Sequence, residues 1–282
     1  MSKRFNVCVV FGERRRMKSA VIYASRLASQ LGADALHVYL PSPTAQTQSP
    51  IVAGGSAAEI QRARVAQTVQ QWQHCPVIVH DDVDLKTARP EQLPPNSIVV
   101  SNELALVRRD LTVLHPFDEV QVLRASGSIL VPFGDGDSGL IAASLAIPLA
   151  KALSLEVLFY HTTWRSETTT SEEPAAHMCV QARAHQQRLQ KLAQAAAVPH
   201  RMAIEMADDV VFGMLHCALN GGVHRHAEPA PVNLIVMAHG VNTYLGSYVE
   251  KALKVSPTPI LVAAILTSAT PGATPPANEI TS

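Results

Sequence analysis

A turn rich in glycine and aspartate is the first part of the sequence that could act on a ligand. Gly134, Asp135, Gly136 and Asp137 follow an apolar run and precede a stretch rich in alanine and leucine. Glycine lets backbone N–H groups approach a phosphate group, and the N-terminus of the following helix attracts anions. The pattern predicts either a residual nucleotide site or a plain turn in which Asp137 or Ser138 caps the helix.

A second candidate site lies further along the chain. His239 and Gly240 end one apolar run, and Gly246 and Ser247 begin the next helical stretch. Only five residues, 241–245, separate the two pairs. These residues predict either a short turn with a helix cap or a small anion site that uses the backbone N–H groups of the next helix.

Other groups of reactive side chains point less clearly to chemistry. Three arginines, at 14–16, form a solvated run or a contact for an anionic ligand at the start of the first expected helix. His216, Cys217, His224 and His226 lack the second tight pair that zinc sites use, so we expect no metal site. No G-x-S-x-G motif is present, and no catalytic triad is indicated.

The composition excludes several classes of protein. Of 282 residues, 47% are hydrophobic and 16% are charged, which excludes wholesale disorder. Because 23 basic residues balance 23 acidic ones, we expect no nucleic acid partner. No apolar run is long enough for membrane insertion, and the first residues lack a signal core, so we expect a cytoplasmic protein. We expect the four scattered cysteines to be small, buried hydrophobic residues in a reducing compartment; they are Cys8, Cys75, Cys179 and Cys217.

An internal repeat organises the chain and positions these candidate sites. Residues 7–39 align without a gap over residues 129–161, with nine identical pairs among 33. Each copy has an apolar run, a Phe-Gly turn, a stretch with helical spacing and a second apolar run. Strand, helix and strand in this order predict a βαβ unit with parallel strands.

The repeat continues at changing offsets, so we expect an α/β fold of two tandem, doubly wound, mostly parallel five-stranded units. The interpreted boundaries are 1–127 and 128–266, with a disordered tail at 267–282. The run 128–131 is assigned to the first strand of the second repeat. The first repeat then lacks an obvious fifth strand, for which residues 111–114 are the candidate. We expect the repeats to pack as an intramolecular pseudo-dimer, with residues 259–262 as the contact edge.

Several short motifs, in the right order, resemble the universal stress protein family. The opening run 129–133, with its turn and helix, resembles the strand, V-P-x-D-G-S and helix of that family. The run 234–240 resembles the strand that enters its G-x-H-G motif, Gly246-Ser247 resembles its later G-S, and 255–262 resembles its closing C-P-V-L-V strand. The resemblance implies a five-stranded sheet with helices on both faces. In ATP-binding members the site lies at the carboxyl ends of the first and fourth strands.

The sequence departs from the ATP-binding pattern of that family, which is G-x-x-G, nine residues and then G-S or G-T. Met237 occupies the first glycine position, and only five residues follow Gly240 before Gly246. Gly134 stands where the family has its adenine-side aspartate, and Asp135 is displaced by one position. No glycine cradle remains in the first repeat. We therefore expect ATP to bind weakly or not at all.

The preferred interpretation is a non-enzymatic cytoplasmic regulatory protein of the universal stress type, without a required cofactor and with an unknown regulatory protein as partner. A homodimer is a further possibility. One alternative is an ATP- or AMP-binding universal stress protein that uses the second repeat. Another is an enzyme similar to ATP pyrophosphatases, because Phe133 to Ser138 partly resemble their S-G-G-x-D-S loop. The first serine and second glycine of that loop are missing here.

Overall fold

The fold is described from a computed structural model. Its described residues are 5–10, 15–40, 63, 67, 75–80, 83, 85, 87–116, 126–164, 171–220, 231–239 and 246–265. The expected tail at 267–282 lies outside these residues. None of the described helices is long and apolar enough to cross a membrane.

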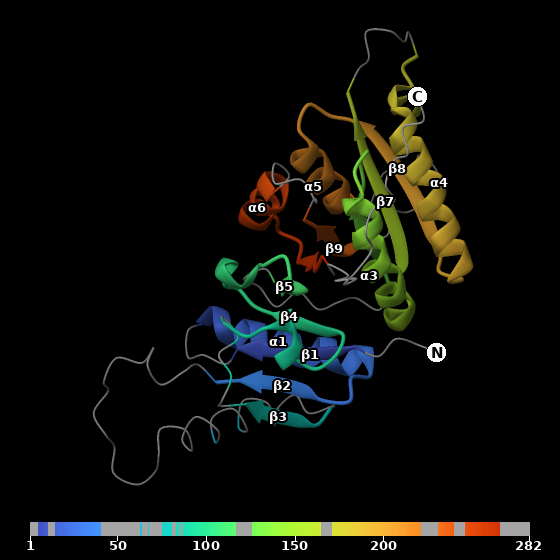
Figure 1. The fold of residues 1–282 in the computed structure, drawn as a ribbon. Helices are drawn as coiled ribbons and strands as arrows, with labels where there is room; N and C mark the ends of the chain where they lie inside the picture. The colour runs from blue at the N-terminus through green and yellow to red at the C-terminus, as the bar shows by residue number, and fades with distance from the viewer. Residues whose placement is uncertain are drawn as a thin grey trace, which may run out of the picture.

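One ten-stranded sheet forms the centre of the described structure, in the order β3-β2-β1-β4-β5-β10-β9-β6-β7-β8. Five strands come from the first half of the chain, namely β1 Asn6–Val10, β2 Leu36–Tyr39, β3 Val77–His80, β4 Ser97–Val100 and β5 Val113–His115. Five come from the second half, namely β6 Ser128–Pro132, β7 Glu156–Thr163, β8 His200–Met206, β9 Val232–Ala238 and β10 Ile260–Ala263. Figure 1 shows the two halves side by side, the first in blue to green and the second in green to red.

Both halves have the same strand order, since β3-β2-β1-β4-β5 corresponds to β8-β7-β6-β9-β10. The pairs within each half are parallel, as a βαβ unit requires. The expected α/β fold with a doubly wound, mostly parallel sheet is confirmed. The run 128–131 lies in β6, the first strand of the second half, as assigned.

The halves join through an antiparallel pair, β5 with β10, in which Leu114 faces Leu261. Both side chains are fully buried. The expected contact edge at 259–262 is therefore correct, because β10 covers most of it. The fifth strand of the first half is β5, which overlaps the candidate run 111–114 by two residues.

One face of the sheet carries a core that spans both halves. Helix α1 (Arg15–Leu31) and helix α3 (Ser138–Leu153) pack there, and α4 (Val180–Ala195) covers the outer strands of the second half. The residues that match between the repeats point into this core. They are Ala20, Ala24, Leu27 and Ala28 of α1 and Ala142, Ala146, Leu149 and Ala150 of α3. Small alanine side chains let the helices approach the sheet closely, which explains why these positions repeat.

The opposite face is covered differently in each half. In the second half, α5 (Val210–Asn220) and α6 (Gly246–Val255) bury one apolar cluster against β6, β7, β9 and β10. In the first half, an irregular cover of loops and two short 3-10 helices, η2 (Pro90–Gln92) and η3 (Leu104–Leu106), buries a smaller cluster around Leu85, Leu93 and Leu106 against β1 and β4. Val107 contacts both clusters and links the two covers.

Candidate functional site

The candidate site lies where β6 and β9 run side by side in parallel, with Leu130 opposite Ile235. Here the chain order of the strands reverses, because β7 follows β6 on one side while β9 lies on the other. Helix α3 leaves β6 on one face of the sheet, and α6 leaves β9 on the other. In open α/β sheets, ligands bind in the crevice beyond the carboxyl ends of the strands at such a reversal.

The first predicted group, Gly134 to Asp137, forms the connection from β6 to α3. A Cβ atom added at Gly134 or Gly136 would meet nothing within 4 Å, so packing does not require glycine there. Asp137 stands at the N-cap position of α3, but its side chain makes no capping hydrogen bond. Its backbone carbonyl accepts from Ile141 N at 3.0 Å instead. The expected cap by the Asp137 side chain is therefore wrong: the residue at the N-cap already has helical backbone, with φ of −72° and ψ of −8°, and makes no capping bond.

Two histidines from other elements hold this turn. His161 of β7 lies 2.8 Å, through Nδ1, from the carbonyl oxygen of Phe133, and its ring stacks on the Phe133 ring at 4.9 Å. His185 of α4 lies 3.0 Å, through Nδ1, from the carbonyl oxygen of Gly134. A carbonyl oxygen only accepts, so each Nδ1 carries the proton and donates. The turn is thus fixed from two sides.

The charge around this turn is mainly negative. Asp135 and Asp137 are exposed at the start of α3, where the positive end of the helix dipole stabilises their carboxylates. His185 Nε2 lies 3.8 Å from Asp137 Oδ1. Burial lowers the pKa of His161, while its bond to Phe133 and the nearby Asp135 act in the opposite direction. A phosphate group would meet two carboxylates here, whereas a nucleoside base would not be repelled by them.

Sequence reasoning missed both histidines. His185 follows Ala182 by three residues and precedes Leu189 by four, and all three side chains are buried on one face of α4. This spacing was visible in the sequence and marks a polar side chain on an apolar face. It could not show which carbonyl group the ring would reach.

The second predicted group follows β9. His239 comes directly after the strand, and Gly246 and Ser247 are the first residues of α6. Gly240 and the connection 241–245 lie outside the described residues. Met237 is buried within β9 and lies opposite Val262 of β10. The structure therefore places His239 and the turn 134–137 at the ends of the neighbouring strands β9 and β6.

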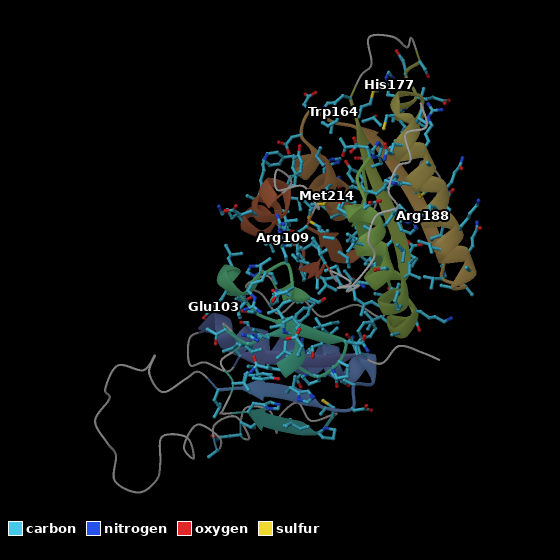
Figure 2. All side chains as sticks on the ribbon, viewed as in Figure 1. Glu103, Arg109, Trp164, His177, Arg188 and Met214 are labelled. Carbon is cyan, nitrogen blue, oxygen red and sulfur yellow. The ribbon has the colours of Figure 1, made fainter. Side chains whose placement is uncertain are left out.

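The His239 ring is half-buried, and its Nε2 atom is fully buried without a hydrogen-bond partner. Burial is the main reason that its pKa lies below the usual value, and the Arg109 guanidinium lowers it further. Arg109 belongs to the first half of the chain. In Figure 2 it lies on the side of the first half that faces α6.

The remaining reactive groups form no metal-binding cluster among the described residues. No cluster of three or more histidine, cysteine, aspartate or glutamate side chains there could hold a metal ion. His216 lies 2.9 Å, through Nε2, from Asn220 Nδ2. Burial is the main cause that raises the pKa of the Cys217 thiol to about 12. His224, His226 and Arg14 lie outside the described residues.

The four cysteines are all free. Cys8 and Cys217 are buried, as expected, and Cys75 is partly buried. Cys179 corrects the expectation, because it is exposed and caps α4, where its Sγ accepts from Ala182 N at 3.4 Å. Its position at the start of a helix, not burial, explains the residue there.

Comparisons with known proteins identify the fold. Scans against protein-family profiles and curated proteins found no match. Among solved structures, a universal stress protein from Archaeoglobus fulgidus DSM 4304 matches with a TM-score of 0.62 and 14% identity, over 92% of this chain and 98% of that chain. This chain has the fold of a universal stress protein.

Shorter structures of the same kind match half of the chain. A universal stress protein family member from Burkholderia pseudomallei matches at 17% identity and a TM-score of 0.37, over 50% of this chain and 98% of that chain. A universal stress protein in complex with cAMP matches at 18% identity and a TM-score of 0.38, over 50% of this chain and 98% of that chain.

Proposed function

We propose that this chain is a non-enzymatic, cytoplasmic regulatory protein of the universal stress type. Its first half, residues 1–127, has lost the nucleotide site, and its second half, residues 128–266, keeps a reduced one. The regulatory output passes through a protein partner. The halves act as an intramolecular pseudo-dimer, consistent with their shared sheet and core.

The observation that carries the proposal is the buried Met237 in β9. The strand continues through Met237 to Ala238, and α6 begins at Gly246. Where the ATP-binding pattern has its first glycine, this chain has a buried methionine side chain in a hydrogen-bonded strand. In the sequence only five residues separate Gly240 from Gly246, where the ATP-binding pattern has nine, so fewer backbone N–H groups are available to hold a triphosphate.

A thermal shift assay with ATP, ADP and AMP tests this proposal. A ligand present at a hundredfold excess over its Kd, and bound only by the native state, stabilises that state by about 2.7 kcal/mol. We expect no clear shift with micromolar ATP. ATP that co-purifies with the chain, or a clear shift at micromolar concentration, would show that the site is intact.

One observation favours the second candidate function, retained binding of AMP or ATP in the second half. Gly134 and Gly136 lack a packing reason to be glycine, and neither has positive φ. Close approach of a ligand to the backbone would supply a reason. Gly136→Ala should then leave the melting temperature unchanged but weaken AMP binding, whereas equal binding by both proteins would count against this function.

The pyrophosphatase-like enzyme is the least supported of the three proposals. The Gly134–Asp137 turn lacks the serine and the second glycine that would cradle pyrophosphate. Incubation with ATP and magnesium should yield no AMP and pyrophosphate above the rate without protein.

A further inference from the structure

We propose that Arg109, from the first half of the chain, binds the phosphate group of a nucleotide held by the second half, beside His239 at the carboxyl end of β9. The inference rests on the location of the reduced site proposed above. It assigns to one guanidinium part of the role that a glycine-rich cradle has in an ATP-binding site. The ligand class is a nucleotide with a short phosphate chain, such as AMP or ADP.

The sheet register brings Arg109 to this place. Ala263 of β10 lies opposite Ala238 of β9, so the chain that leaves β10 runs beside His239. Two residues later, Ile265 N donates to the Arg109 carbonyl oxygen at 2.7 Å. Arg109 is therefore separated from the end of β9 by one neighbouring strand, although it belongs to the other half of the chain.

The segment that carries Arg109 is fixed to the second half on both sides. Before it, Val107 packs against the cluster under α5 and α6. After it, the Thr112 hydroxyl oxygen accepts from Ala264 N at 3.3 Å. Arg109 thus extends from a positioned segment, which lowers the entropy lost when its side chain binds a ligand.

Neighbouring arginines differ in what they do. The Arg108 guanidinium donates to the Ala88 carbonyl oxygen at 2.6 Å and to both carboxylate oxygens of Asp110 at 3.1 and 3.2 Å. Arg109 is exposed, and no hydrogen bond or ion pair holds its guanidinium within the described part of the chain. Arg108 therefore maintains the segment, and Arg109 is available for a ligand.

Charge also distinguishes the two sides of the crevice. The start of α3 follows Asp135 and Asp137, whereas α6 has no acidic residue in its first turn. An anionic group is thus disfavoured beside α3 and favoured on the side of β9 and Arg109. His239 lies on that same side, with its ring half-buried. A nucleotide would place its phosphate there and its base toward the turn at 134–137.

Calorimetric titration of the full chain tests this assignment, with AMP, ADP, adenosine and inorganic phosphate as separate probes. Arg109→Ala removes the proposed contact, and Arg109→Lys keeps the charge without the planar fork. Arg188→Ala is the matched control, because Arg188 is an exposed arginine on α4, on the other side of the second half (Figure 2). Near-ultraviolet circular dichroism checks that each variant is folded.

We expect Arg109→Ala to weaken AMP and ADP binding about tenfold or more, which is the size of a lost charge-assisted hydrogen bond. Arg109→Lys should lose less affinity for AMP and ADP, and Arg188→Ala should bind both nucleotides as tightly as the original chain does. The affinity for adenosine, which has no phosphate group, should be unchanged by all three substitutions. If inorganic phosphate binds as well as AMP and depends on Arg109, the site takes the free ion and the nucleotide assignment is wrong.

A second readout separates a direct role from a structural one. Removing the guanidinium should raise the pKa of His239 in an NMR titration, because the nearby positive charge is gone. Equal AMP affinity of the original chain and Arg109→Ala would overturn the inference. An original chain that binds neither AMP nor phosphate would also overturn it, while leaving the proposed regulatory function with a lost site intact. Tight ATP binding that ignores Arg109 would overturn both.

Discussion

The two halves of the sheet have one strand order but different covers. Helices α5 and α6 close one face of the second half, whereas irregular chain around Leu85 and Leu106 closes the equivalent face of the first half. In both halves the central strands are buried on both faces. The comparison teaches that the apolar strands and the α1 and α3 face maintain the fold, while the other face is free to diverge.

The halves also differ at the carboxyl ends of their strands. The second half has the turn 134–137, held by His161 and His185. In the first half, His37, Tyr39 and His80 stack on one another, with 3.0 Å between His37 Nδ1 and His80 Nε2. These stacked rings lie on β2 and β3, the strands that correspond to β7 and β8 of the second half.

The largest expected effect is at the joint between the halves. Leu261→Asp would place a charge in the buried β5–β10 pair and should lower the free energy of unfolding by more than about 4 kcal/mol. Urea unfolding followed by circular dichroism measures this, and the original chain should show one cooperative transition. Val180→Asp, at a position 86% exposed, is the control and should change stability by less than about 0.5 kcal/mol. Two well-separated transitions in the original chain would mean that the halves fold independently.

The two covers can be compared by one substitution in each. Leu106→Ala acts on the irregular cover of the first half, and Met214→Ala acts on α5 of the second half. Both side chains are buried, with 0% and 1% exposure. Each truncation should cost about 2–5 kcal/mol in urea unfolding, because each leaves a cavity. If Leu106→Ala alone leaves the free energy of unfolding nearly unchanged, the irregular cover of the first half is packed less tightly than α5 of the second half.

Features of this structure that depend on residues close together in the sequence could be predicted, and features that depend on residues far apart could not. The repeat of residues 7–39 in 129–161 predicts one strand–helix–strand unit in each half, because alternation and helical spacing are local patterns. The joint at 259–262 was also predictable, since an apolar edge strand needs a partner. The irregular cover of the first half was not predictable, because it has no periodicity.

The candidate site was predictable only in part. Turn residues such as Gly134 and Asp135 are visible as a local motif. The bonds of His161 and His185 to that turn join residues 28 and 51 positions apart, and the backbone of Arg109, in the first half, accepts a hydrogen bond from Ile265 just after β10. Such contacts depend on sheet register and helix rotation, which no short segment encodes.

A matched pair of positions gives a smaller effect. Gly32 and Ser154 occupy equivalent places after α1 and α3, and both have left-handed backbone, with φ of 58° and 55°. Glycine adopts this conformation without strain, whereas serine does not. Gly32→Ser should lower the free energy of unfolding by about 1 kcal/mol, and Ser154→Gly should raise it by a similar or smaller amount. Thermal unfolding of both variants measures this, and changes of the same sign would contradict the equivalence.

The smallest expected effect is a pH dependence shared by both halves. Burial lowers the pKa of His37, His161 and His239 below the unfolded value of about 6.5. The unfolded chain therefore binds protons more readily, so this contribution to stability is complete above about pH 6.5 and is lost as the pH falls below it. The urea midpoint should be lower at pH 5.5 than at pH 7.5. His37→Gln and His161→Gln should each make the difference between the two urea midpoints smaller. If that difference is unchanged in both variants, these histidines do not cause the pH dependence.

The antiparallel joint also has a consequence for synthesis of the chain. A ribosome produces β5 long before its partner β10, so the nascent first half has an open strand edge while the second half is being made. An unpaired edge can associate with other chains. Strand β10 follows all the other strands of the sheet, and its arrival closes that edge and completes both halves in one step. Chaperone dependence of the nascent chain should therefore end only when β10 has left the ribosome.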